Sequence, residues 1–144
     1  MIKGIGTDIC HVGRIREAMA KSARLAERIL GPGEECREDA RFLARRWAMK
    51  EAVAKAMGTG IGEALGWHDM VITHGEKGNP LCVVKGFERD RIWLSVSDDG
   101  DCAVAFAVWE GAGVCDAQTT KTARQTREAI AKSRGSGHNN QQRK

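Results

Sequence analysis

The sequence has no tyrosine, no long apolar segment and no recognisable cysteine pattern. No apolar run approaches the roughly 18 residues that a membrane-spanning helix needs. The five cysteines are an odd number without CxxC spacing, and the four histidines lack metal-ligand spacing, which argues against a disulfide framework and a zinc site. The first residues carry an early aspartate and no long apolar stretch, so they do not resemble a signal peptide. We therefore expect a cytoplasmic protein with reduced thiols.

The chain has 144 residues, of which 42% are hydrophobic and 29% charged. This length and composition are typical of one globular domain, or of one domain with a tail. A domain of this size buries enough surface to fold without disulfides or structural metals. No internal repeat is visible.

The positive charge is concentrated in two regions. Residues 116–144 contain seven Lys and Arg against two acidic residues, whereas residues 1–115 contain sixteen basic and seventeen acidic residues. We therefore expect a folded domain over residues 1–112 and a disordered basic tail over residues 113–144. Within the folded part, residues 14–50 hold ten basic and six acidic residues. A localised basic face of this kind suits an acidic partner better than a generic polyanion.

Two helices are predicted in the first half of the chain. Residues 13–30 have apolar side chains close to helical spacing and end at a Gly-Pro-Gly sequence. Residues 41–57 are rich in good helix formers, with Asp39 placed to cap the N-terminus and Gly58 placed to end the helix. The second helix is expected to bury its bulky apolar side chains.

Strands are predicted at the N-terminus and throughout the second half. Residues 2–6 form a short apolar segment that ends just before Asp8. Segments 70–73 and 81–84 flank one hairpin loop, and segments 91–96 and 102–109 flank a second loop over 97–101. The nearly continuous apolar run 103–108 indicates a central strand. The expected fold is therefore α+β, with two main helices packed on an antiparallel sheet.

The predicted helix over 41–57 carries the most informative polar residues. Glu51 and Lys55 are four residues apart and share a face, while Arg46 and Lys50 lie along a neighbouring stripe. Glu-Lys pairs at this spacing are common on helix surfaces and are worth only about 0.3–0.5 kcal/mol, so a plain surface pair is the simpler interpretation of the spacing. If the fold brings Asp8 beside Glu51, however, the two carboxylates would suit Mg²⁺, with phosphate and water as further ligands.

The helix runs into a glycine-rich sequence, Gly-Thr-Gly-Ile-Gly, at residues 58–62. Backbone N–H groups in such a segment could approach an anion closely. The sequence is neither a P-loop, because no Gly-Lys-Ser/Thr follows, nor a dinucleotide fingerprint, because it follows a helix instead of opening one. By itself it is a weak signal.

Three segments of the sequence match the motifs of one known family. Residues 4–9 read Gly-Ile-Gly-Thr-Asp-Ile and are followed by Arg14 and Ile15, as in the family's N-terminal motif. Residues 42–60 read Phe-Leu-Ala-Arg-Arg-Trp-Ala-Met-Lys-Glu-Ala-Val-Ala-Lys-Ala-Met-Gly-Thr-Gly and are similar to its second motif. Residues 78–80, Gly-Asn-Pro, resemble its short turn. Together these segments resemble the holo-acyl-carrier-protein synthase family, and the resemblance covers about residues 1–110.

The resemblance implies a 4′-phosphopantetheinyl transferase. Such enzymes use Mg²⁺ to move the phosphopantetheine arm of coenzyme A to a serine of apo-acyl carrier protein, and they release 3′,5′-ADP. It also implies a compact α+β homotrimer with active sites at subunit interfaces, and a role in fatty acid biosynthesis or a specialised pathway. The base for the serine would be Glu51 acting through a water, or a hydroxide on the metal; the sequence does not choose between them.

The family's roles can be carried over to matching positions. Asp8 and Glu51 would be Mg²⁺ ligands, and Glu51 and Lys55 would be catalytic. Arg46 and Lys55 would hold phosphates of coenzyme A.

Further positions are assigned in the same way to the two substrates. The coenzyme A site would also include Gly58, Thr59 and Pro80. The acidic carrier protein would contact Arg14, Arg24 and Arg28.

The chain departs from the family at one site position and in its tail. Many members carry Val-Ser-x-Thr-His on a late strand, where this sequence has Asp98 in place of the histidine. The basic tail is also unusual, and it suggests an alternative function as a nucleic-acid-binding module. Against that alternative, the chain has no tyrosine and no known nucleic-acid motif.

Overall fold

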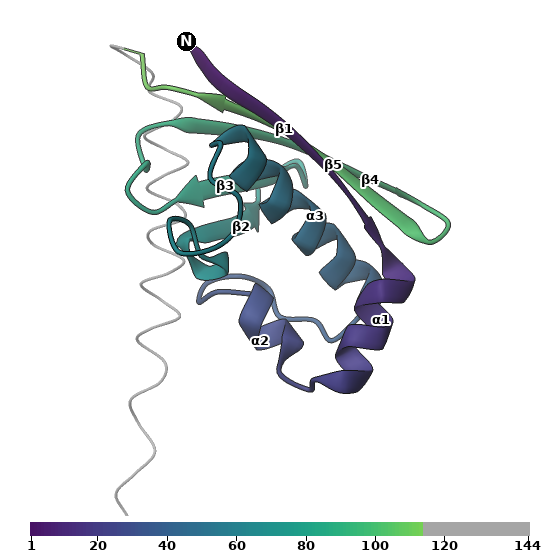
Figure 1. The fold of residues 1–144 in the computed structure, drawn as a ribbon. Helices are drawn as coiled ribbons and strands as arrows, with labels where there is room; N and C mark the ends of the chain where they lie inside the picture. Colours follow the sequence, from purple (N-terminus) through teal and green to yellow (C-terminus); the bar gives the residue numbers. More distant parts are fainter. Residues whose placement is uncertain (114–144) are drawn as a thin grey trace, which may run out of the picture.

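The computed structural model describes residues 1–113 as one antiparallel sheet covered on one face by helices (Figure 1). The strands lie in the order β1-β5-β4-β3-β2. The predicted tail over 113–144 lies, apart from its first residue, outside the described part. The elements, in chain order, are β1 (Ile2–His11), α1 (Val12–Lys21), α2 (Leu25–Ile29), α3 (Ala40–Ala56), the short 3₁₀ helix η1 (Trp67–Asp69), β2 (Met70–His74), β3 (Pro80–Val84), β4 (Arg91–Asp99) and β5 (Cys102–Glu110).

The α+β class and both hairpins are confirmed, but two strand boundaries were wrong. Strand β1 continues to His11, so Asp8 lies within the strand, opposite Ala105 of β5. Strand β4 continues to Asp99, because Ser97 and Asp98 still pair with β5. The predicted loop over 97–101 is therefore only a tight turn. Strand β5 has neighbours on both sides, as expected for a central strand.

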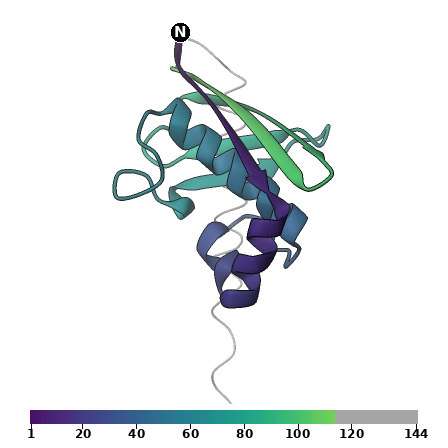
Figure 2. The same ribbon diagram turned by 45° about the vertical axis from the view of Figure 1, so that its right-hand side comes forward.

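The helices differ from the prediction at one place. The single helix expected over 13–30 is two helices, because the chain leaves helical geometry at Ser22, whose backbone is extended. Helix α3 was predicted over residues 41–57 and spans Ala40–Ala56, one residue earlier at each end. The Asp39 carboxylate accepts hydrogen bonds from the backbone N–H groups of Arg41 and Phe42, and Gly58 follows the helix with a φ of +73°. Figure 2 shows α1 and α2 beside the N-terminal half of α3.

Helix α3 lies directly on strand β1 because two glycines leave room for its backbone. A Cβ atom on Gly4 or Gly6 would collide with the carbonyl oxygens of Ala56 and Ala52, respectively. Glycine within a strand often marks such a close approach of another backbone. The small side chains on both elements therefore set the distance between the helix and the strand.

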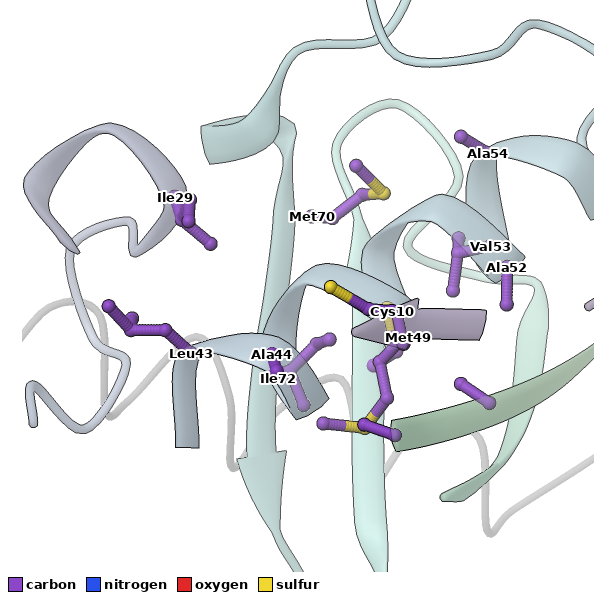
Figure 3. Packing of buried hydrophobic residues seen from close by; sticks show 14 of the residues in the cluster. Cys10, Ile29, Leu43, Ala44, Met49, Ala52, Val53, Ala54, Met70 and Ile72 are labelled. Atoms are coloured by element: carbon purple, nitrogen blue, oxygen red, sulfur yellow. The ribbon is translucent and has the colours of Figure 1, made fainter. Parts of the chain in front are cut away.

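The hydrophobic core lies between α3 and the sheet. Its fully buried members include Leu43 and Val53 of α3 and Met70 and Ile72 of β2 (Figure 3). Ile29 of α2 extends the same core toward the small helices. Within residues 1–113, no helix combines the length and apolar character needed to cross a lipid bilayer.

The opposite face of the sheet carries exposed apolar side chains. Along β1, Gly4, Gly6 and Asp8 alternate with residues on the other face, and the paired positions of β5 and β4 continue that face. Its large exposed members are Ile5, Ile9, Trp93, Val104 and Phe106. A contiguous apolar patch of this kind on a folded chain marks an interaction surface.

Candidate active site

The structure brings together Asp8 of β1 and Glu51 and Lys55 of α3. The Lys55 ammonium lies 2.8 Å from Asp8 Oδ1 and donates a second hydrogen bond to the Thr7 carbonyl, at 3.1 Å. Asp8 and Glu51 are partly buried, and Lys55 is exposed. Gly6 allows α3 to approach β1 closely. Asp8 therefore shares one small site with Glu51 and Lys55, although these two residues lie more than 40 positions further along the sequence.

The three charges perturb one another. Partial burial raises the pKa of Glu51 and the negative charge of Asp8 raises it further, while the Lys55 ammonium opposes the shift. The hydrogen bond to Asp8 is the main reason that the pKa of Lys55 is raised. The raised pKa of Glu51 makes its carboxylate a stronger base than an ordinary glutamate.

The donor set at this site fits Mg²⁺. Within the described residues, no three His, Cys, Asp or Glu side chains gather as a complete metal cage. Mg²⁺ commonly takes only one or two protein carboxylates and completes its octahedron with waters and substrate phosphates. Asp8 and Glu51 are two such carboxylates, and they are near enough for the negative charge of Asp8 to raise the pKa of Glu51.

The glycine-rich segment after α3 does not present its N–H groups to an anion. The N–H of Gly58 donates to the Lys55 carbonyl, and those of Thr59 and Gly60 both donate to the Ala54 carbonyl. These bonds cap the helix C-terminus, so the N–H groups of Gly58, Thr59 and Gly60 are already used within the chain. Gly58 and Thr59 are nevertheless exposed at the end of the helix that carries Lys55.

Arg46 and Pro80 are not brought to this site within one chain. The Arg46 side chain is 1% exposed, and it donates to the Ile72 carbonyl at 2.8 Å while stacking on the Phe42 ring. A guanidinium in this position does not reach a phosphate beside Lys55. Pro80 begins β3, which two strands separate from β1.

The basic face predicted over residues 14–50 is smaller than its composition suggests. Arg14, Arg24 and Arg28 are exposed on α1, before α2 and on α2. Arg46 and Lys50, by contrast, lie in the interior, at 1% and 0% exposure. The exposed arginines of the first two helices remain available for an acidic partner.

Asp98, which replaces the expected histidine, binds two arginines of α3. Its carboxylate oxygens each lie 3.3 Å from a guanidinium nitrogen, one of Arg41 and one of Arg45. The residue thus connects the end of β4 to the first turns of α3. Nothing in the sequence indicated these two partners.

Sequence reasoning also missed Glu34 and the packing role of the two glycines. Glu34 entered only as one of the six acidic residues counted in residues 14–50, but its carboxylate is fully buried against Lys50. No local sequence pattern identifies a buried ion pair between residues 16 positions apart. Gly4 and Gly6 did offer a signal, because glycine at alternate positions of a strand indicates a closely packed backbone on one face.

Comparisons with known proteins agree with this arrangement. A family model described as the 4′-phosphopantetheinyl transferase superfamily matches residues 4–107. The holo-acyl-carrier-protein synthase of Vibrio cholerae serotype O1 is 38% identical over 124 residues, which covers 76% of this chain and 98% of that protein.

Solved structures give the same result. The crystal structure of holo-acyl-carrier-protein synthase from Neisseria meningitidis matches with a TM-score of 0.69 and 37% identity, over 76% of this chain and 99% of its own. The Bacillus anthracis synthase, in complex with coenzyme A (3′,5′-ADP), matches with a TM-score of 0.67 and 34% identity, over 78% of this chain and 99% of its own. The chain therefore belongs to the holo-acyl-carrier-protein synthases of the 4′-phosphopantetheinyl transferase superfamily.

Proposed function

We propose that this phosphopantetheinyl transferase moves the 4′-phosphopantetheine group of coenzyme A to a serine of apo-acyl carrier protein and releases 3′,5′-ADP, in a reaction that depends on Mg²⁺. The observation that carries the proposal is the convergence of Asp8, Glu51 and Lys55 where α3 crosses β1. The Bacillus anthracis relative was crystallised with coenzyme A (3′,5′-ADP), which supports the same donor and product here.

The charged side chains have distinct tasks in this reaction. Asp8 and Glu51 would hold Mg²⁺, which when bound supplies positive charge to the pyrophosphate. Lys55 is exposed beside them, so its ammonium can turn from Asp8 to a substrate phosphate and hold it in place. Glu51, whose pKa is raised, is the side chain best suited to accept the serine proton through a water molecule.

Acyl carrier protein is the proposed second substrate, and it would dock on Arg14, Arg24 and Arg28. Among residues 1–113, Arg14 and Arg28 form no ion pair with an acidic side chain, and Arg24 pairs only with Glu27 on the surface. Such exposed positive charges attract an acidic partner at a rate that falls as salt increases. A nucleic-acid-binding function based on the tail is not favoured by the family.

We also propose the homotrimer that the family resemblance implies. The apolar sheet face opposite α3 supports it, since Ile5 and Ile9 are each 63% exposed and Phe106 is 45% exposed in the single chain. Association through this face would remove the patch from water. A site shared between subunits would also explain why Pro80 lies far from Asp8 within one chain. Light scattering of the purified protein, alone and with Phe106→Lys, measures whether the face carries the assembly.

The reaction is tested by mixing the full-length protein with coenzyme A, Mg²⁺ and the host's apo-acyl carrier protein, and then weighing the carrier by intact mass spectrometry. The expected result is a gain of one phosphopantetheine that disappears when a chelator is added. Glu51→Gln should reduce the rate by at least about 100-fold while leaving the melting temperature nearly unchanged, because Glu51 lies at the surface of the site.

Two controls separate the parts of the proposal. Glu63→Gln changes an exposed glutamate after α3 and should leave turnover unchanged. If Glu51→Gln is as active as the wild type, the proposed metal and base roles are wrong. If the carrier gains no mass although coenzyme A binds, a different carrier protein is the substrate.

A further inference from the structure

Lys50 is a fully buried lysine whose ammonium group has three acceptors. Its side chain is 0% exposed. Its Nζ donates to the Ile29 carbonyl at 2.7 Å, to the Trp67 carbonyl at 2.8 Å and to Glu34 Oε2 at 2.5 Å. An ammonium has three N–H donors, so all of its donors are used by these three acceptors.

The partner carboxylate is equally constrained. Glu34 Oε2 also accepts from the N–H of Gly31, at 2.7 Å, and Oε1 accepts from the N–H of Ile72, at 3.3 Å. Oε1 lies 3.9 Å from the buried guanidinium of Arg46. A buried charged group with directional partners on several sides holds its surroundings in one arrangement when all partners are in place.

These bonds attach one side of α3 to three other elements. Ile29 is the last residue of α2, Trp67 is the first residue of η1, and Glu34 connects through Ile72 to strand β2. The helix is held against β1 on another side, where Gly6 meets the Ala52 carbonyl. Together the two attachments restrict both the position of α3 and its rotation about its own axis.

Rotation matters because Lys50 and Glu51 are adjacent on the helix. Successive residues of an α-helix point about 100° apart, so the direction of Lys50 fixes the direction of Glu51. Apolar contacts alone tolerate small rotations, whereas three hydrogen bonds to one ammonium do not. We propose that Lys50, held by Glu34, is a positioning residue that sets the rotation of α3 and so keeps Glu51 directed at Asp8.

This inference rests on the proposed function of the Asp8–Glu51–Lys55 site, and its experiment distinguishes the two. The test variant is Lys50→Met in the full-length chain, which keeps an unbranched side chain one atom shorter and removes the ammonium. It is expected to fold, because Glu34 retains the N–H groups of Gly31 and Ile72 and the nearby Arg46. Lys50→Gln, which restores an N–H donor without charge, serves as the second variant if Lys50→Met does not fold.

Ile29→Ala is the matched control. It removes a fully buried side chain at the same junction but leaves every acceptor of Lys50 in place, since Lys50 uses only the Ile29 carbonyl. Both variants are expected to have a lower melting temperature. The comparison therefore separates a general loss of stability from a loss of orientation.

Two properties are measured for each variant at a temperature where all are folded: the binding of Mn²⁺, followed by the spectroscopic signal of the free ion, and kcat and KM for coenzyme A. We expect Lys50→Met to bind Mn²⁺ about 10-fold to 100-fold more weakly and to lose kcat more than it changes KM. Ile29→Ala should match the wild type in both.

The outcomes are separable. If Lys50→Met, or Lys50→Gln in its place, matches Ile29→Ala in Mn²⁺ affinity and in kcat, the positioning role is refuted and Lys50 is only structural. If Glu51→Gln binds Mn²⁺ as tightly as the wild type, the metal assignment fails. The positioning role is then judged by kcat alone, where a loss confined to the Lys50 variants supports it and equal values refute it.

Discussion

Replacing Gly6 with alanine should separate α3 from β1 and disable the site without removing any charged group. A Cβ atom at this position would lie 2.5 Å from the Ala56 nitrogen and closer still to the Ala52 carbonyl oxygen, whereas real Cβ atoms essentially never come within 3.0 Å of another heavy atom. The obstacles are backbone atoms, so no side-chain rotation relieves the contact. The helix must therefore retreat by more than about 0.5 Å.

The expected magnitudes follow from this displacement. Inserting a carbon into a closely packed contact costs about 1–3 kcal/mol, and the upper part of this range applies because the helix backbone must move. At about 4 °C per kcal/mol for a domain of this size, the melting temperature should fall by about 8–12 °C. Turnover should fall by about 100-fold, because Lys55 is 2.8 Å from Asp8 and a displacement near 1 Å is enough to misalign reacting groups.

The assay combines thermal unfolding with the mass-spectrometric transfer reaction at a temperature where the variant is folded. Gly113→Ala is the matched control, since a Cβ atom there meets no atom of residues 1–113 within 4 Å. The reasoning is refuted if Gly6→Ala has the melting temperature and turnover of the wild type.

Two further predictions concern ion pairs outside the site. Asp98→Asn should lower the free energy of unfolding by less than about 1 kcal/mol, because its partners Arg41 and Arg45 are partly exposed, and by less still at high salt. Denaturant unfolding at two salt concentrations measures this, and a loss of stability that does not depend on salt would contradict it. Asp90 accepts hydrogen bonds from the Ala112 N–H, Trp109 and Lys3, which outweigh burial and lower its pKa. The wild type should therefore be more stable than Asp90→Asn above pH 3.8, and the difference should disappear as the pH falls below the native pKa; a difference that persists in acid would show that charge is not its cause.

Local patterns predicted the parts of this fold that depend on local interactions. The capping carboxylate of Asp39 and the glycine after α3 each act within a few residues. The end of β1 was misplaced because Thr7 and Asp8 remain in the strand through pairing with β5, about 98 residues away in sequence. Strand ends that depend on such distant partners leave little trace in the local sequence.

The sequence also predicted only part of the site, namely the residues that belong to the matching motifs. The motif resemblance placed Asp8, Glu51 and Lys55 in one group, and the structure brings them together. Helical spacing placed Arg46 and Lys50 along a stripe beside Glu51 and Lys55 but did not show that both are buried. Charged residues are rarely buried without partners, and the partner carboxylate of Glu34 lies in a loop whose position relative to α3 is decided only by the tertiary fold.

The alternation of strand β1 gives two tasks to neighbouring residues. Asp8 points toward α3, whereas Ile9 belongs to the apolar face on the opposite side. A shift of the strand by one residue along β5 would exchange the two faces. It would direct the carboxylate into the surface proposed for assembly and an isoleucine into the proposed catalytic site. Deleting or inserting a single residue before Asp8 should therefore abolish catalysis and association together, whereas most substitutions on one face affect only one of them.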